Sequence, residues 1–237
     1  MTHPQLVATR LVENRYPGCV AAFLAGSIIR GEGTPTSDLD LVIVTEEDSD
    51  APYRCSERVG NWPVEFFVHT PASLQTFFHK DMAHRTPSLL QMCSEGLVIR
   101  QKNGQAQAIK EQCDTLLAAG PALLSDQETR AKRYQLSDLL EDLNGSDKRE
   151  EIVYIAAELA QTAADLWLAH HRRWSGHGKW LHRALLKADP KTAQCLHEAL
   201  EKLYAQTDKT ALMDFAEAVL ALVGGPLFDG FDSRLQD

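Results

Sequence analysis

The feature that most constrains the fold is a pair of aspartates, Asp38 and Asp40, at the head of the apolar run Leu39–Val44. A short apolar run bounded by turn residues is typical of a buried β-strand. Side chains alternate along a strand, so Asp38 and Asp40 point to one face while Leu39 points to the core. Two carboxylates on one face form a hard oxygen site that suits Mg²⁺. The pattern therefore predicts a magnesium site at the start of this strand.

An earlier apolar run, Val20–Leu24, ends at Gly26-Ser27, and a loop of ten residues separates Ser27 from Asp38. We expect the two apolar runs to form adjacent buried strands. Glycine lets a backbone approach a phosphate closely, and serine offers a hydroxyl and a backbone N–H to phosphate oxygens. Gly26 and Ser27 are therefore candidate nucleotide-binding residues, and the alternative is that they form an ordinary turn.

Glu65 is a third candidate ligand, because it lies inside the apolar run Val64–Val68. That run follows Tyr53–Val59 across the turn Gly60-Asn61, which is typical of a β-hairpin. A charged residue within a buried strand is costly unless it is paired or binds metal. Asp38, Asp40 and Glu65 together are suited to hold two Mg²⁺ ions, one for the attacking hydroxyl and one for a triphosphate. The alternatives are a solvated turn for the aspartates and an edge-strand glutamate facing water.

The rest of the chain is predicted to be mainly helical, with one more strand. We expect a helix over His3–Arg15, a helix from Pro71 to about His84, a helix with Thr86 as its N-cap, and an edge strand at Leu97–Ile99. From Gln105 onward the pattern is helical, and Gly120-Pro121 marks a boundary. We therefore predict two domains, residues 1–120 and residues 121–237.

The second half is predicted to be an all-α antiparallel helical bundle. The predicted core stripe recurs every three or four residues, at Ile152, Ile155, Leu159, Ala163, Leu166 and His170. A basic and aromatic stretch follows, and in it Lys179 and Arg183 share one helical face. They are candidates to bind the β and γ phosphates, and the alternative is a solvated basic face.

Further candidates are less specific. Glu141, Asp142 and Glu158, on predicted helices of the second half, are candidates for a general base. Each is also typical of a surface charge. The spacing of the histidines near His170 matches no standard zinc site. The spacing of Arg172 and His177 loosely resembles the short signature of HEPN ribonucleases.

Composition limits the function classes. The net charge of −9 disfavours broad binding to nucleic acid and favours a small cationic substrate. Five scattered cysteines without metal-site spacing are interpreted as reduced packing residues. No apolar run approaches the roughly 18 residues of a membrane span, and no export signal is evident. We therefore expect a cytoplasmic enzyme without a membrane segment.

The Gly-Ser pair, the ten-residue loop, the Asp-x-Asp strand and the later strand glutamate resemble the DNA polymerase β nucleotidyltransferase superfamily. The segment Glu95–Arg100 resembles the end of such a domain in the small-molecule, kanamycin nucleotidyltransferase-like branch. The resemblance implies an α+β fold with a small mixed β-sheet. It also implies Mg²⁺ at Asp38, Asp40 and Glu65, and a triphosphate held by Gly26 and Ser27.

The activity that the resemblance implies is transfer of a nucleoside monophosphate from an NTP, with release of pyrophosphate. We expect ATP as the donor and a hydroxyl of a small, aminoglycoside-like compound as the acceptor. Arg30 and Arg54 are the nearest cations to the motif in the first half, so we expect Lys179 of the second half to reach the phosphates as well. A partner-protein acceptor, as in antitoxin-like members, and a ribonuclease of the HEPN type remain alternatives.

Overall fold

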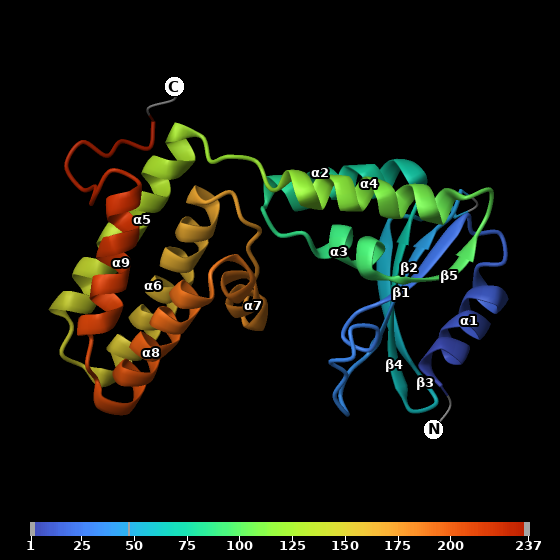
Figure 1. Ribbon diagram of the computed structural model, residues 1–237, viewed down its shortest axis with the longest axis horizontal. Coiled ribbons are helices and arrows are strands. Elements are labelled where there is room, and N and C mark those ends of the chain that lie inside the picture. The colour runs from blue at the N-terminus through green and yellow to red at the C-terminus, as the bar shows by residue number, and fades with distance from the viewer. Residues whose placement is uncertain (1–2, 47, 235–237) are drawn as a thin grey trace. The chain divides into compact units, whose positions relative to one another are not determined.

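The computed structural model describes residues 3–46 and 48–234 (Figure 1). The protein has the predicted α+β fold, in which a five-stranded mixed sheet precedes a helical region. Residues 1–120 and residues 121–237 form two compact units. That each unit folds independently as a domain stays a prediction.

The sheet belongs to the first unit and has the strand order β3-β4-β2-β1-β5. Its strands are β1 (Ala21–Ala25), β2 (Leu39–Val44), β3 (Tyr53–Val59), β4 (Trp62–His69) and β5 (Leu97–Gln101). Strands β2 and β4 pair in parallel, and the other neighbouring pairs are antiparallel. The expected edge strand at Leu97 is confirmed as β5. Strand β4 is an inner strand, so the edge-strand alternative for Glu65 is wrong.

Helices cover both faces of this sheet (Figure 1). They are α1 (Pro4–Arg15), α2 (Pro71–Ala83), α3 (Ser88–Glu95) and α4 (Gln105–Ala119). Leu11 and Val12 of α1 join a buried apolar cluster with Leu41 of β2 and Phe66 of β4. Alternation along the strands turns the neighbouring residues, Asp40 and Glu65 among them, to the opposite face.

The start of α3 differs from the prediction. The helix begins at Ser88, and its N-cap position is Pro87, which has no capping side chain; Thr86 is therefore not the N-cap. Asp81 of α2 accepts hydrogen bonds from the backbone N–H groups of Leu89 and Leu90, at 2.7 and 2.9 Å. The first backbone N–H groups of a helix usually bond to the side chain of the preceding N-cap residue. In α3 a side chain from another helix takes that place.

The second unit is a helical bundle. Its helices are α5 (Asp126–Gly145), α6 (Arg149–His170), α7 (Lys179–Ala188), α8 (Pro190–Gln206) and α9 (Thr210–Leu222). Helix α6 packs against α5, α7, α8 and α9. The predicted core stripe along α6 is buried or partly buried as far as Leu166, whereas His170 is exposed and does not belong to it.

Among the described residues, helix α6 is more apolar than the expectation about membrane segments allowed for. It is long and apolar enough to cross a membrane by length and composition, and 56% of its apolar window is buried. The buried side chains belong to the apolar cluster of the bundle. A core helix passes the same test. Cytoplasmic location stays a prediction.

The cysteines divide into two groups. All five are free, and Cys19, Cys93 and Cys113 are buried packing residues as expected. Cys55 and Cys195 are exposed, so the interpretation as packing residues is wrong for these two. Cys55 lies on the edge strand β3 and Cys195 on α8.

We expect buried His69, at the end of β4, to make the folding stability depend on pH. Burial lowers the pKa of His69 from 6.5 to about 4, and its side chain is only 4% exposed. Between these values the unfolded chain binds the extra proton, so stability falls as pH drops from 6.5 to 4, by up to about 3 kcal/mol. Urea unfolding of wild type and His69→Asn across this range should show a flatter pH dependence in the variant.

The comparison with His69→Asn is needed because buried carboxyl groups act in the opposite direction. The pKa values of Asp40 and Asp81 are raised to about 6, mainly by burial, so these groups stabilise the native state as pH falls. The wild type and His69→Asn both retain these carboxyl groups. The difference between their pH dependences of stability therefore reports on His69 alone. Equal pH slopes for wild type and variant would contradict the assignment.

Candidate active site

Three carboxylates meet on one face of the sheet. Asp40, on β2, is the direct neighbour of Glu65 on β4 in the parallel register, and Asp38 immediately precedes β2. Each side chain offers an oxygen such that all three oxygens lie within 4.8 Å of one another. All three residues are partly buried. The structure therefore brings the three predicted ligands together, while their catalytic role stays a prediction.

The cluster fits a divalent cation. Carboxylate oxygens are hard ligands, and oxygens that share one ion lie no further apart than twice the metal–oxygen distance, about 4.2 Å for Mg²⁺ and about 5 Å for a larger ion such as Ca²⁺. The three oxygens lie within 4.8 Å of one another, which meets the limit for the larger ion and is close to the limit for Mg²⁺. The residues can hold a divalent metal, and its identity as Mg²⁺ stays a prediction.

The electrostatics of Asp40 support the same conclusion. Burial, followed by the negative charges of Asp38 and Glu65, raises the pKa of Asp40 to about 6, although Arg54 and Arg30 lower it. Like charges that are crowded and partly desolvated repel one another. A cation between the carboxylates would relieve this repulsion.

Gly26 is positioned directly against Asp40. It follows Ala25, which pairs with Asp40 in the β1–β2 register, and it has a φ of +85°. A Cβ atom built on Gly26 would lie 2.1 Å from Oδ2 of Asp40. Glycine is therefore required both by the left-handed backbone and by the neighbouring carboxylate. The sequence had suggested the approach of a phosphate, and that role stays a prediction.

Ser27 helps to hold the loop that leads to Asp38. Its hydroxyl donates to Oγ of Ser37 at 2.9 Å, and Oγ of Ser37 accepts from the backbone N–H of Thr34 at 2.8 Å. This hydroxyl network joins the two ends of the loop. Phosphate binding by Ser27 stays a prediction.

Arg54 is a site residue whose partner the sequence did not reveal. It donates to Oε2 of Glu65 at 2.5 Å, and its guanidinium carbon lies 4.8 Å from the ring centroid of Phe67. The signal was present in the turn: a two-residue turn at Gly60-Asn61 pairs Ser56 with Glu65 and makes Arg54 a diagonal neighbour of Glu65.

The other predicted site residues lie in the second unit. Lys179 and Arg183, on α7, lie beside Trp180, with Nζ and Cζ at 5.6 and 4.8 Å from its ring centroid. Their binding to nucleotide stays a prediction. The same holds for the candidate bases and for the loose ribonuclease signature, all exposed: Glu141, Asp142, Glu158, Arg172 and His177.

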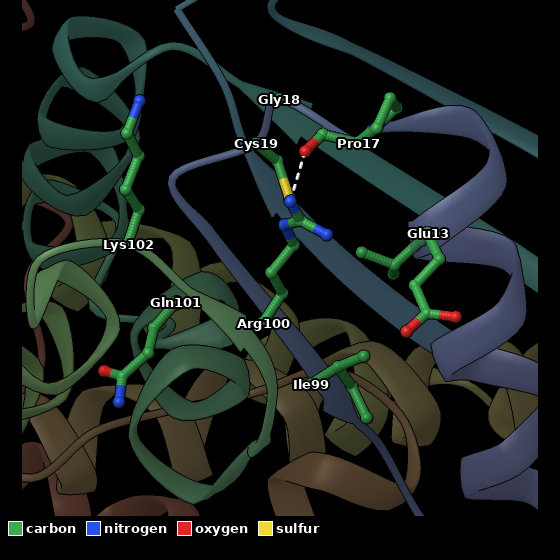
Figure 2. A pocket seen from close by; sticks show the side chains of 9 residues that line it. Glu13, Pro17, Gly18, Cys19, Ile99, Arg100, Gln101 and Lys102 are labelled. Carbon is green, nitrogen blue, oxygen red and sulfur yellow. Dashed lines mark hydrogen bonds between the residues drawn. The ribbon is translucent and has the colours of Figure 1, made fainter.

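A pocket of about 590 Å³ lies elsewhere in the first unit (Figure 2). Its lining includes Glu13, Arg100 and Lys102, and Arg100 donates to the carbonyl oxygen of Pro17. Arg100 pairs with Ala22 near the start of β1, whereas the carboxylates lie at its end. None of the predicted site residues lines this pocket.

The family model described as "Nucleotidyltransferase domain" matches residues 8–170, more than half of the chain. No curated protein matches. Among solved structures, a nucleotidyltransferase-like protein from Exiguobacterium sibiricum 255-15 is similar, with 13% identity and a TM-score of 0.49. That match covers 92% of this chain and 73% of the other.

Proposed function

This chain belongs to the nucleotidyltransferase domain family, and we propose that it transfers AMP from ATP to a hydroxyl of a small cationic acceptor. The family membership establishes a transferase that moves a nucleoside monophosphate and uses an NTP. The choice of ATP, of Mg²⁺ and of the acceptor belongs to the proposal. The observation that carries it is the cluster of Asp38, Asp40 and Glu65.

In this proposal the three carboxylates would hold the metal beside the start of β2. A divalent ion there supplies charge neutralisation of the triphosphate and activation of the attacking hydroxyl. Gly26 leaves the space that the Asp40 carboxylate occupies. The Ser27–Ser37 hydrogen bond holds the loop between the two strands.

The reaction joins the acceptor oxygen to the α-phosphorus and breaks the bond to pyrophosphate, which leaves with the displaced electrons. The acceptor hydroxyl loses its proton to a base, for which Glu141, Asp142 and Glu158 remain candidates. The net charge of −9 supports a cationic acceptor, because an acidic surface attracts one. No observation on the described residues favours a protein acceptor or ribonuclease activity.

A transfer assay tests this function. The full chain is incubated with Mg²⁺ and each α-labelled NTP, against aminoglycosides, lincosamides, small metabolites and the polypeptide itself. We expect label to move from ATP to a hydroxylated, cationic compound, and Asp38→Asn to abolish the transfer. Label on the polypeptide would favour the partner-protein alternative. Absence of transfer from every NTP to every acceptor would refute the proposal.

Lys179 carries a separate prediction. We propose that its ammonium group binds the triphosphate as a point charge. Lys179→Ala should then weaken binding of ATP about tenfold or more, the size of a charge-assisted hydrogen bond. Thermal stability should remain nearly unchanged, because the side chain is exposed. Calorimetric titration with ATP and Mg²⁺ measures the effect.

Lys187→Ala is the matched control for Lys179→Ala, because Lys187 is an exposed lysine at the other end of the same helix. It removes the same charge and should bind ATP like the wild type. If both variants bind ATP equally well, Lys179 does not contact the phosphates and belongs to a solvated basic face.

A further inference from the structure

The pairing of Arg54 with Glu65 places a cation directly beside a predicted metal ligand. Arg54 lies on β3 and Glu65 on β4, and the guanidinium holds Oε2 of the carboxylate. The Arg54 side chain is 61% exposed, and the Glu65 side chain 23%. The arginine side chain is thus largely exposed, so it can change partner with little disturbance of the fold.

Charge explains why this pair forms. Asp38, Asp40 and Glu65 crowd three carboxylates within 4.8 Å, and each ionised group opposes the ionisation of the others. Arg54 offsets part of this charge, since it lowers the pKa of Asp40. A divalent ion at the carboxylates would also neutralise their negative charge, and it would bring two positive charges instead of one. It also repels the guanidinium, so the ion and Arg54 compete for Glu65.

The phosphates of a nucleotide are a suitable second partner for Arg54. The triphosphate brings more negative charge to a face that already carries three carboxylates. A guanidinium offers a planar fork of donors that matches two phosphate oxygens at once. The ring of Phe67 lies 4.8 Å from Cζ of Arg54 and supports the guanidinium on this face of the sheet.

We propose that Arg54 is a nucleotide-binding residue that exchanges partners. It holds Glu65 in the metal-free protein, and it binds phosphate oxygens of the NTP once a divalent ion has taken the Glu65 carboxylate. The inference rests on the proposed metal site at Asp38, Asp40 and Glu65. It adds a second role, because Arg54 also sets how tightly the metal binds before nucleotide arrives.

The other face of the sheet provides a matched control. Arg15 pairs with Glu57 of β3, with 2.7 Å between Nη2 and Oε1, and its Cζ lies 5.4 Å from the ring centroid of Phe66. Arg15 and Arg54 therefore make the same two contacts, an ion pair and a cation–π contact. Phe66 and Phe67 are consecutive in β4 and point to opposite faces, so Arg15 lies away from the carboxylates.

The first measurement is metal binding without nucleotide. Mn²⁺ is titrated into the full chain and free Mn²⁺ is followed by electron paramagnetic resonance. Arg54→Ala should bind Mn²⁺ about two- to fivefold more tightly than wild type, the size of an exposed ion pair that no longer competes. Arg15→Ala should bind Mn²⁺ like the wild type. Weaker Mn²⁺ binding by Arg54→Ala would overturn the inference, because Arg54 would then be orienting Glu65 for the metal.

The second measurement is nucleotide binding at saturating Mg²⁺, by calorimetry with a non-hydrolysable ATP analogue. Arg54→Ala should bind the analogue about tenfold or more weakly, since a charge-assisted hydrogen bond is lost. Arg54→Lys should lie between Arg54→Ala and wild type, because it keeps the charge without the fork. Unchanged analogue binding by Arg54→Ala would also overturn the inference.

Arg54→Ala is expected to bind Mn²⁺ more tightly and the ATP analogue more weakly. These opposite changes distinguish partner exchange from a purely structural role of Arg54. Loss of folding would weaken both metal and nucleotide binding, and thermal melting of each variant checks for it. Failure of the wild type itself to bind Mn²⁺ would refute the proposed metal site and the inference with it. Normal Mn²⁺ binding by wild type, with no difference in Arg54→Ala, would refute the inference alone.

Discussion

Asp40→Asn should lower nucleotidyl transfer about a thousandfold or more, while the free energy of unfolding stays the same or rises slightly. Asparagine keeps the shape of the side chain and removes one hard anionic ligand, which is worth several kcal/mol in a metal-assisted transfer. Folding stability should not suffer, because burial and two neighbouring carboxylates already raise the pKa of Asp40 to about 6. Removing that charge relieves the repulsion.

Single-turnover transfer from an α-labelled NTP measures the rate, and urea unfolding measures the stability. Asp38→Asn should behave in the same way as Asp40→Asn. Asp50→Asn is the matched control, because it makes the same chemical change at an exposed position of the first unit. Retained activity in both Asp38→Asn and Asp40→Asn would falsify the central claim about the site.

Gly26→Ala should reduce transfer by about a hundredfold or more and destabilise the first unit by about 1–3 kcal/mol. The new Cβ atom would lie 2.1 Å from Oδ2 of Asp40, so either the carboxylate or the strand end has to move. Misplacing a catalytic group by about 1 Å is enough to cost this much in rate. The φ of +85° adds strain for any residue other than glycine.

Gly60→Ala separates the clash from the strain. Gly60 lies in the β3–β4 turn with a φ of +60°, and a Cβ atom there meets nothing within 4 Å. Gly60→Ala should therefore lose stability without losing activity, as measured by the same unfolding and transfer assays. Equal activity of Gly26→Ala and Gly60→Ala would show that Gly26 does not control the position of Asp40.

Much of the fold follows from local patterns. The five strands and the helical second half were predictable, because strand alternation and helical spacing are properties of neighbouring residues. The errors occurred where the packing of one element against another decides the outcome. Asp81 of α2 caps α3 in place of Thr86, and α6 carries His170 beyond the buried part of the bundle.

The sequence by itself determined which side chains have the chemistry of the site and, through strand alternation, that Asp38 and Asp40 share a face. Only the tertiary structure decided that Glu65 is the neighbour of Asp40, because the parallel β2–β4 register depends on the packing of the whole sheet. Only the tertiary structure likewise explains why residue 26 is glycine. The contact of Gly26 with Asp40 depends on how the ends of two strands pack together, and no local pattern along one strand encodes it. The pairing of Arg54 with Glu65 is different, because the short turn of the β3–β4 hairpin already makes these residues diagonal neighbours.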